Sequence, residues 1–192
     1  MATGHTDPQR RERILAATLD LITEAGVAGV SHRKIATRAQ VPLGSMTYHF
    51  TGIDDLLRQA FTRFADHIVA VFEQHLSRAG SPEQAREAVT DLIHTLSEGP
   101  RRDLVLAHEL YTLAARRPEY RQLTQEWMNR SRHLLEQHFD ADTARQLDAL
   151  IEGLTLHRAL VRSPHDRALT RRAVDRITAP WAAPPAARGE RP

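Results

Sequence analysis

The chain has 192 residues, 41% hydrophobic and 26% charged, and its formal net charge at pH 7 is +2. Because it contains no cysteine, disulfide bonds, cysteine-ligated zinc and thiol catalysis are all excluded. No stretch approaches the roughly 18 consecutive apolar residues of a membrane span, and the N-terminus has no apolar signal region. We therefore expect a cytoplasmic protein with no membrane partner.

The composition predicts an all-α fold. Aromatic residues make up only 5% of the chain, while Ala, Leu, Arg and Glu are abundant. Apolar residues recur at helical spacing and predict about nine helices in all. We expect a small three-helix domain over residues 8–53, a larger helical domain over residues 54–179, and flexible tails at residues 1–7 and 180–192.

The N-terminal domain begins with an expected helix over about residues 9–25. Ser31 can cap a second, short helix, because its hydroxyl can accept from the free N–H groups of the first turn. That helix ends before Val41, because a residue that precedes proline is disfavoured in the helical region. Pro42 then opens a third helix over about residues 42–49. Two short helices joined by a tight turn are typical of a helix-turn-helix.

The charge of this segment is one-sided. Residues 25–53 contain no carboxylate, but they include Arg33, Lys34 and Arg38. A nucleic acid approaching the segment would meet cations and no like charge. On charge alone, an ordinary solvated helix face explains the pattern equally well. Gly44 is a poor helix former, and its place on a short helix suggests that another backbone, such as a sugar-phosphate strand, comes close there.

Six further helices are expected after Gly52. The first is long enough to belong to both domains. The expected ranges, from apolar spacing and from Gly and Pro at the ends, are residues 54–78, 82–98, 101–116, 119–138, 142–162 and 164–178.

The expected helix over residues 142–162 is apolar on more than one side and must be covered twice. Leu147, Ile151 and Leu154 line one side. The other side carries Ala149, Gly153, Leu156 and Leu160, and the small residues among them would let a second helix come close. We expect this helix and the last one to pair with their twins from a second copy in a four-helix bundle, which makes a homodimer.

The N-terminal segment resembles the DNA-binding domain of the TetR family of bacterial transcriptional regulators. The resemblance covers roughly residues 8–61. The residues that carry it are Gly26, Ile35, Ala36, Ala39, Val41, Tyr48, His49, Phe50, Leu56 and Leu57. Beyond that segment the similarity is only in the number and size of the helices.

The resemblance implies which residues bind DNA. The positions that match phosphate-binding or base-facing positions of the family are Ser31, His32, Arg33, Leu43, Gly44, Ser45, Thr47, Tyr48 and His49. Ile53 stands where the family usually has a lysine, so one phosphate contact is expected to be absent. The resemblance also assigns the long helix after Gly52 a bridging role between the domains.

A small-molecule pocket is expected in the larger domain. Aromatic walls with a few polar groups are typical of such pockets. The candidate lining residues are Phe61, Phe64, His108, Tyr111, Trp127 and His157. For any single one of them, ordinary core packing is the favoured explanation, because aromatic residues at helical spacing mostly pack.

The search for catalytic or metal-binding chemistry gives weak candidates only. Ser31 and Lys34 match S-x-x-K, but the partner motifs of that enzyme class are absent, and no glycine-rich phosphate loop is present. Asp91, His94 and Glu98 would share one helix face and could seat a metal ion, although such triples also arise by chance. We expect no enzyme activity, no metal and no cofactor.

The sequence thus predicts a homodimeric regulator, expected to be a repressor, that a small-molecule effector releases from a palindromic double-stranded DNA operator. Effector binding would tilt the long bridging helix and change the separation of the two recognition helices. Two rivals stay open. One is an all-helical metal-binding protein or enzyme that uses Asp91, His94 and Glu98. The other is an architectural DNA binder that responds to no effector.

Overall fold

The computed structural model describes residues 8–179, and within them it contains helices and no strand. The expected tails at residues 1–7 and 180–192 lie outside the described part. Within it there are nine α-helices and two single-turn 3₁₀ helices. They are α1 (Pro8–Ala25), η1 (Val27–Gly29), α2 (His32–Ala39), α3 (Gly44–His49), α4 (Ile53–Leu76), α5 (Pro82–Glu98), α6 (Arg101–Arg116), η2 (Pro118–Tyr120), α7 (Arg121–Glu136), α8 (Ala141–Leu160) and α9 (Arg167–Thr178).

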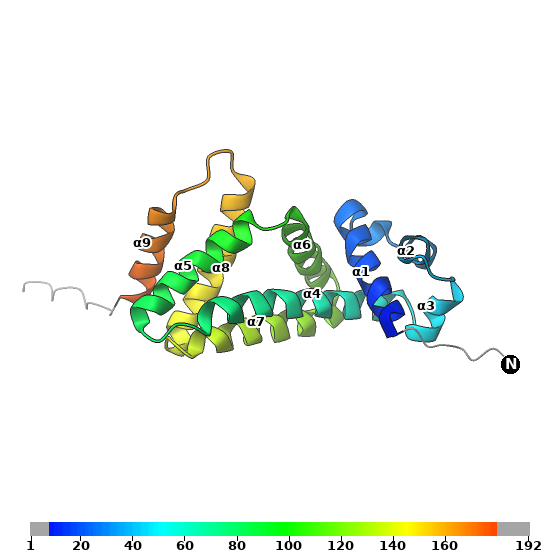
Figure 1. The fold of residues 1–192 in the computed structure, drawn as a ribbon, viewed down its shortest axis with the longest axis horizontal. Coiled ribbons are helices and arrows are strands. Elements are labelled where there is room, and N and C mark those ends of the chain that lie inside the picture. The colour runs from blue at the N-terminus through cyan, green and yellow to red at the C-terminus, as the bar shows by residue number, and fades with distance from the viewer. Residues whose placement is uncertain (1–7, 180–192) are drawn as a thin grey trace, which may run out of the picture.

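The helices α1, α2 and α3 gather at one end of an elongated molecule (Figure 1). The hydroxyl of Ser31 caps α2 by accepting from the backbone N–H of Lys34 at 3.4 Å, as expected. Gln40 then ends α2 in the left-handed region, with φ 54°. The tight turn that the sequence predicted between the two short helices is therefore present.

The third helix begins at Gly44 and not at Pro42. Pro42 and Leu43 form a tight turn instead, in which Ser45 N–H donates to the Pro42 carbonyl at 2.9 Å and Met46 N–H donates to the Leu43 carbonyl at 3.0 Å. These are three-residue steps of the 3₁₀ kind, which often tighten a helix terminus. The regular helix thus begins two residues later than Pro42 predicts.

A small apolar core joins the three helices to the start of α4. Fully buried side chains from each helix meet there, and Leu56 and Leu57 of α4 are buried with them. The side chain of Asp55 secures this junction, since its carboxylate accepts from the Thr51 N–H at 3.0 Å in front of the first turn of α4. The first turn of α4 therefore belongs to the core of the N-terminal helices.

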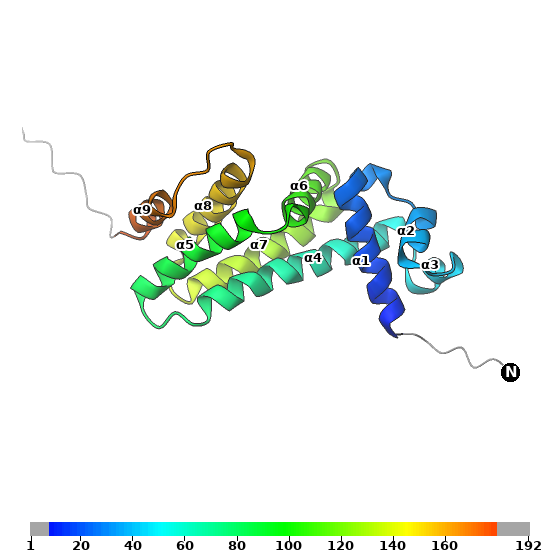
Figure 2. The ribbon, with the colours of Figure 1, turned by 45° about the horizontal axis from the view of Figure 1, so that its top comes forward.

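The helix α4 runs from that core along the rest of the molecule, and both ribbon views show it leading away from α1 (Figures 1 and 2). Its apolar residues at three- and four-residue steps, from Phe61 to Leu76, are buried along its length. The helices α5, α6 and α7 pack against it. The expected long helix that serves both halves of the chain is present.

Two of the later helices start differently from the expectation. The 3₁₀ helix η2 occupies residues 118–120, so α7 begins at Arg121, two residues later than expected. The last helix begins at Arg167 and not at Pro164, because the carboxylate of Asp166 caps it by accepting from the Leu169 N–H at 2.8 Å. An aspartate is a strong N-cap, and here it is a better start signal than the proline upstream.

The helix α8 is covered on one of its two apolar sides and open on the other, where the sequence predicted a second copy. Leu147 and Ile151 are buried, whereas Leu160 is 67% exposed, and a Cβ added at Gly153 would meet no atom within 4 Å. Leu156 departs from the expected open side, because it lines an internal cavity. Among the described residues, no helix combines the length and the apolar character needed to cross a bilayer.

Candidate DNA-binding face and effector cavity

The surface of α2 and α3 presents a group of exposed side chains. Tyr48 is 73% exposed and Leu43 is 51% exposed, which is unusual for large apolar residues. Gly44 and Thr47 are exposed beside them, and space around Gly44 is open, since a Cβ there would meet nothing within 4 Å. The helix α3 thus offers a side on which another molecule can approach the backbone closely.

The three cations of this segment have different surroundings. Lys34 donates through Nζ to the Gly29 carbonyl at 2.7 Å. Arg38 forms a two-pronged pair with Glu24 at 2.8 and 2.7 Å, and this pairing lowers the pKa of the Glu24 carboxyl. Arg33 is exposed and pairs with none of the described residues. Of the three, Arg33 is therefore the one whose guanidinium stands free for a phosphate or a base edge.

Ser45 was expected to face outward, and the structure corrects this. Its side chain is only 8% exposed, and the neighbouring Met46 is 1% exposed. These two residues form the inner side of the short helix α3, which packs Met46 into the core. His32 and His49 are half-buried, and Ser31 is exposed but occupied as the cap of α2.

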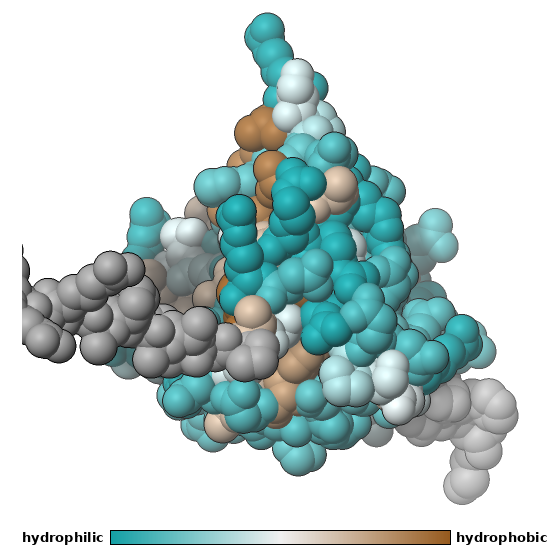
Figure 3. Space-filling view, turned by 90° about the vertical axis from the view of Figure 1, so that its left-hand side faces the viewer, coloured by the Kyte–Doolittle hydropathy of each residue, from teal (hydrophilic) through white to brown (hydrophobic). Residues whose placement is uncertain are grey.

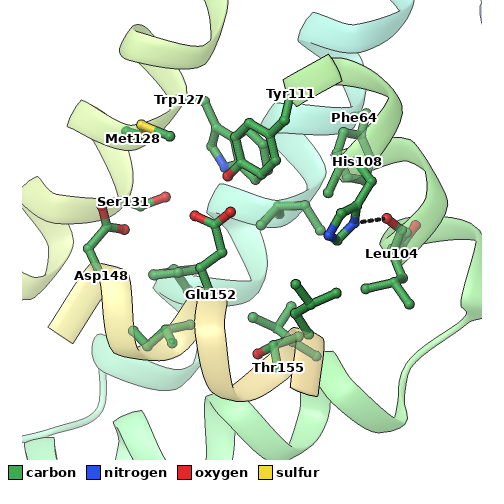
Figure 4. Close-up of a pocket in the computed structure, with 17 residues that line it drawn as sticks. Phe64, Leu104, His108, Tyr111, Trp127, Met128, Ser131, Asp148, Glu152 and Thr155 are labelled. Carbon is green, nitrogen blue, oxygen red and sulfur yellow. Dashed lines mark hydrogen bonds between the residues drawn. The ribbon is translucent and has the colours of Figure 1, made fainter. Parts of the chain in front are cut away.

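An internal cavity lies in the larger helical part (Figure 4). Its volume is about 100 Å³, below the roughly 300–1,000 Å³ of small-molecule sites, and it is partly open to solvent. Five helices contribute its walls. The lining residues are Phe64, Ile68, Phe72, Leu96, Asp103, Leu104, Ala107, His108, Tyr111, Trp127, Met128, Ser131, Asp148, Ile151, Glu152, Thr155 and Leu156.

One wall of the cavity is aromatic. The rings of Tyr111 and Trp127 are stacked, with centroids 5.5 Å apart and planes 12° from parallel. Phe64 meets Trp127 edge-on at 5.7 Å. Aromatic pairs in these two arrangements are favourable beyond the area that they bury. The stack is therefore a rigid surface for a flat ligand.

The α8 side of the cavity is acidic, and α6 adds a third carboxylate. Asp103, Asp148 and Glu152 line the cavity, whereas none of its lining residues is a lysine or arginine. Burial raises the pKa of Asp148 to about 6, and the nearby Glu152 raises it further against the opposing charges of Arg132 and Arg145. Burial and then the charge of Glu152 raise the pKa of the Tyr111 hydroxyl. Asp148 is thus partly desolvated, whereas Glu152 is exposed to solvent.

Both halves of the chain match known families. Residues 14–60 match the family described as bacterial regulatory proteins, tetR family, and residues 80–180 match the tetracyclin repressor-like C-terminal domain. The chain belongs to the TetR family of transcriptional regulators. It is a DNA-binding regulator whose N-terminal part is the DNA-binding domain and whose C-terminal part is the ligand-binding domain.

Three relatives illustrate the similarity. The structure of SCO7518 from Streptomyces coelicolor A3(2) is 72% identical, with a TM-score of 0.87 over 90% of this chain and 100% of that one. The multidrug binding protein EbrR complexed with ethidium is 36% identical, with a TM-score of 0.72 over 89% of this chain and 99% of that one. The regulator BetI 1 of Chromohalobacter salexigens is 28% identical over 162 residues, which are 80% of each chain.

In this TetR-family chain, four of the six expected pocket residues line the cavity, and two do not. Phe64, Trp127, Tyr111 and His108 are in its walls. Phe61 is fully buried but lies about one turn nearer the DNA-binding helices. His157 is exposed, because five residues place it about 140° around α8 from Glu152. Whether the four bind a ligand stays a prediction.

Sequence reasoning missed the acidic wall of the cavity. Asp148, Ile151, Glu152 and Thr155 recur at three- and four-residue steps on α8, so they share one side of the helix. Two carboxylates four residues apart, on the same side as the apolar Ile151, were a signal that could have found them. They were overlooked because only the apolar residues of this helix were assigned to its sides.

In the TetR-family fold, the residues of the alternative metal site have other interaction partners. The Asp91 carboxylate pairs with Arg167 at 2.5 Å, and the Glu98 carboxylate pairs with Arg158 at 2.5 Å. His94 directs Nε2 to the Thr170 hydroxyl at 3.0 Å. Across residues 8–179, no three His, Asp or Glu side chains are grouped as metal ligands would be. Partners other than a metal ion thus occupy this expected triple.

Contacts between α6 and the N-terminal helices connect the two sites. The Glu109 carboxylate accepts from the Val27 backbone N–H at 2.9 Å, just after α1. Gly26, with φ 67°, makes room for this contact, because a Cβ there would lie 3.1 Å from a Glu109 oxygen. On the same helix, Tyr111 and His108 line the cavity. The helix α6 therefore contacts the cavity and the DNA-binding domain at once.

Proposed function

We propose that this TetR-family regulator is a homodimeric repressor and that a small organic effector in the cavity releases it from a palindromic operator. Residues 8–53 would read the DNA, and residues 54–179 would bind the effector and the second copy. The observation that carries the proposal is the double contact of α6, which lines the cavity and holds the turn after α1. A change in the cavity can thus reach the DNA-binding helices through rigid structure.

The exposed side of α2 and α3 would lie against the duplex. Arg33 would meet a phosphate or a base edge, and Tyr48 would meet the sugar-phosphate backbone, because both are exposed at a place without carboxylates. Leu43, Gly44 and Thr47 would face the bases, with Ser31, His32 and His49 beside the backbone. The buried Ser45 would support α3 from inside and have no direct DNA contact.

The second copy would pack on α8 and α9. Leu160, Val161 and Leu169 are 67%, 49% and 41% exposed there. The molecule viewed from the α9 side shows brown apolar patches within a mostly hydrophilic surface (Figure 3). A symmetric pair would place its two α3 helices about 34–36 Å apart for consecutive major grooves, so a palindromic operator follows from the twofold axis.

The effector would act through its different affinity for two arrangements of the domains. The helix α4 begins in the DNA-binding core and lines the cavity with Phe64 and Phe72, and α6 connects the same two places. An occupied cavity would favour an arrangement in which both helices shift and the spacing of the α3 helices no longer suits the operator. EbrR, 36% identical, is a multidrug binding protein solved with ethidium, which supports an organic small molecule as the effector.

The test begins with selection of the preferred duplex from a random pool, followed by anisotropy titrations on that duplex. We expect a preference of at least about a thousandfold over random DNA. Arg33→Ala or Tyr48→Ala should each weaken binding about tenfold or more with unchanged circular dichroism, because each contact occurs twice in a dimer. Arg130→Ala removes one positive charge from α7 and should have little effect.

The outcome separates the proposal from its rival. An architectural DNA binder would bind all duplexes within a small factor of each other, and no cavity ligand would change its affinity. Normal operator binding by both variants would remove α2 and α3 from the interface. A protein that sediments as a monomer at the concentration of full operator binding would remove the symmetric pair.

A further inference from the structure

We propose that the cavity selects an aromatic organic cation, which lays its flat ring system beside the Tyr111 and Trp127 stack and directs its positive charge to Glu152. The identity of this occupant as the effector rests on the proposed function. The selectivity itself rests only on the chemistry of the cavity walls.

The charge of the cavity lining favours a cation. Three carboxylates line the cavity, and no lysine or arginine does. Asp103 has His67 at 3.5 Å, and Asp148 feels the opposing charges of Arg132 and Arg145. Glu152 forms no ion pair with any residue of the described chain; it is exposed, and its carboxylate accepts a hydrogen bond from the Tyr111 hydroxyl. A carboxylate without a cationic partner at the edge of an apolar cavity favours a cation and repels an anion.

The cavity also has hydrogen-bonding atoms without partners. His108 uses Nδ1 to donate to the Leu104 carbonyl at 2.7 Å, which leaves Nε2 of the neutral ring as an acceptor. The hydroxyl oxygen of Thr155 is buried without a hydrogen-bond partner in the structure. Together with the carboxylates, these atoms mostly accept hydrogen bonds. A ligand with N–H donors or a delocalised positive charge would satisfy them.

The aromatic wall lies next to the Glu152 carboxylate. Figure 4 shows the Glu152 carboxylate directed toward Tyr111 and Trp127, with His108 to one side and Met128 to the other. The stack and the edge-on Phe64 hold the two rings in place. Aromatic faces attract cations through their quadrupole and pack against flat apolar rings. The ring system and the charge of one ligand would therefore be recognised side by side.

Glu152 is the residue that we assign to charge selectivity, and the stack is assigned to shape. These roles predict opposite patterns on substitution. Glu152→Gln keeps the volume and the hydrogen-bonding reach but removes the charge, so only cation binding should weaken. Tyr111→Leu removes the stacked face, so charged and neutral flat ligands should both weaken.

The experiment measures binding of three flat probes to the full chain at pH 8 by isothermal titration calorimetry. N-methylacridinium has a fixed positive charge, acridine is neutral at this pH, and acridine-9-carboxylate is an anion. In the natural chain we expect N-methylacridinium to bind at least tenfold more tightly than acridine, and the anion to bind most weakly. Glu152→Gln should reduce the difference between cation and neutral probe to less than threefold.

The matched control is Glu136→Gln, which removes a carboxylate from an exposed part of α7 outside the cavity and should leave all three affinities unchanged. Melting temperatures of each variant without ligand show that the fold is kept. Equal binding of cation and neutral probe by the natural chain overturns the inference. So does absence of cation binding, tightest binding of the anion, or a preference that survives Glu152→Gln.

A parallel anisotropy titration on the selected duplex separates this inference from the proposed function. A cation preference that depends on Glu152, with unchanged operator affinity, supports the inference and contradicts effector-driven release. Release of the duplex by the neutral or anionic probe, with no preference for the cation, supports effector-driven release and overturns the inference.

Discussion

The DNA-binding face and the cavity have opposite charge patterns in a chain that is nearly neutral. The face on α2 and α3 lies in a stretch, residues 25–53, with three cations and no carboxylate. The cavity has three carboxylates and neither lysine nor arginine. A net charge of +2 therefore includes two regions with charges of opposite sign.

The two sites also differ in how they hold their charges. The cations of the DNA-binding face are exposed, and salt screens such charges over about 8–10 Å. The carboxylates of the cavity stand beside aromatic walls, where burial already raises the pKa of Asp148 to about 6. The difference teaches that a surface site attracts its ligand because like charge is absent over a wide area. A cavity attracts its ligand through a few carboxylates with no lysine or arginine in the lining.

The largest effect is expected from breaking the charge pattern of the DNA-binding face. Thr47→Glu places a carboxylate on the exposed side of α3 while keeping a good helix former there. Each subunit would then bring a negative charge close to the DNA phosphates, so operator affinity should fall by about a hundredfold or more. Anisotropy titrations check this. Ala70→Glu on the exposed side of α4 is the control and should bind within about threefold of the natural chain.

A smaller effect is expected from removing the buried charge of the cavity. The pKa of Asp148 is raised in the folded state, so its contribution to stability is present below the unfolded value near 3.8 and is lost as pH rises to about 6. Asp148→Asn should therefore raise the free energy of unfolding at pH 7.5 by roughly 1–2 kcal/mol and change it little at pH 4.

Urea unfolding of the ligand-free protein at the two pH values measures this difference. Arg132 on α7 and Arg145 and Glu152 on α8 are the charged groups that act on Asp148, and none of them changes in the variant. Asp142→Asn, in the exposed first turn of α8, is the matched control. An equal gain at pH 4 and pH 7.5 would mean that packing, not ionisation, causes the stabilisation.

The smallest effect is expected from removing the contact between α6 and the turn after α1, which connects the two sites. Glu109→Ala removes the acceptor of the Val27 N–H but touches neither the cavity lining nor the DNA-binding face. Ligand affinity and operator affinity measured separately should change less than threefold, whereas their mutual effect should weaken about threefold to tenfold. Glu109→Gln keeps an acceptor and should restore most of the coupling.

That prediction is measured by titrating the duplex with and without saturating ligand. Undiminished coupling in Glu109→Ala would assign the connection to α4 alone. In that case the long bridging helix, which the sequence already indicated, would suffice without the contact after α1.

Local sequence patterns predicted most helices well, because their signals act within a few residues. Ser31 caps α2, and Gly99 and Pro100 separate α5 from α6 at the expected place. Two starts were wrong where two local signals competed. Pro42 gives way to a tight turn before Gly44, and Pro164 gives way to the stronger cap at Asp166.

By itself, the sequence determined the all-α class, the helix-turn-helix and the family, since these depend on periodicity, caps and a local motif. Only the tertiary structure decided which side chains meet. It turned Ser45 inward, separated Phe61 and His157 from the cavity, and brought Glu152 of α8 to the rings of α6 and α7. Such contacts depend on how whole helices pack. The same local sequence pattern can present a charged residue either to solvent or to a cavity.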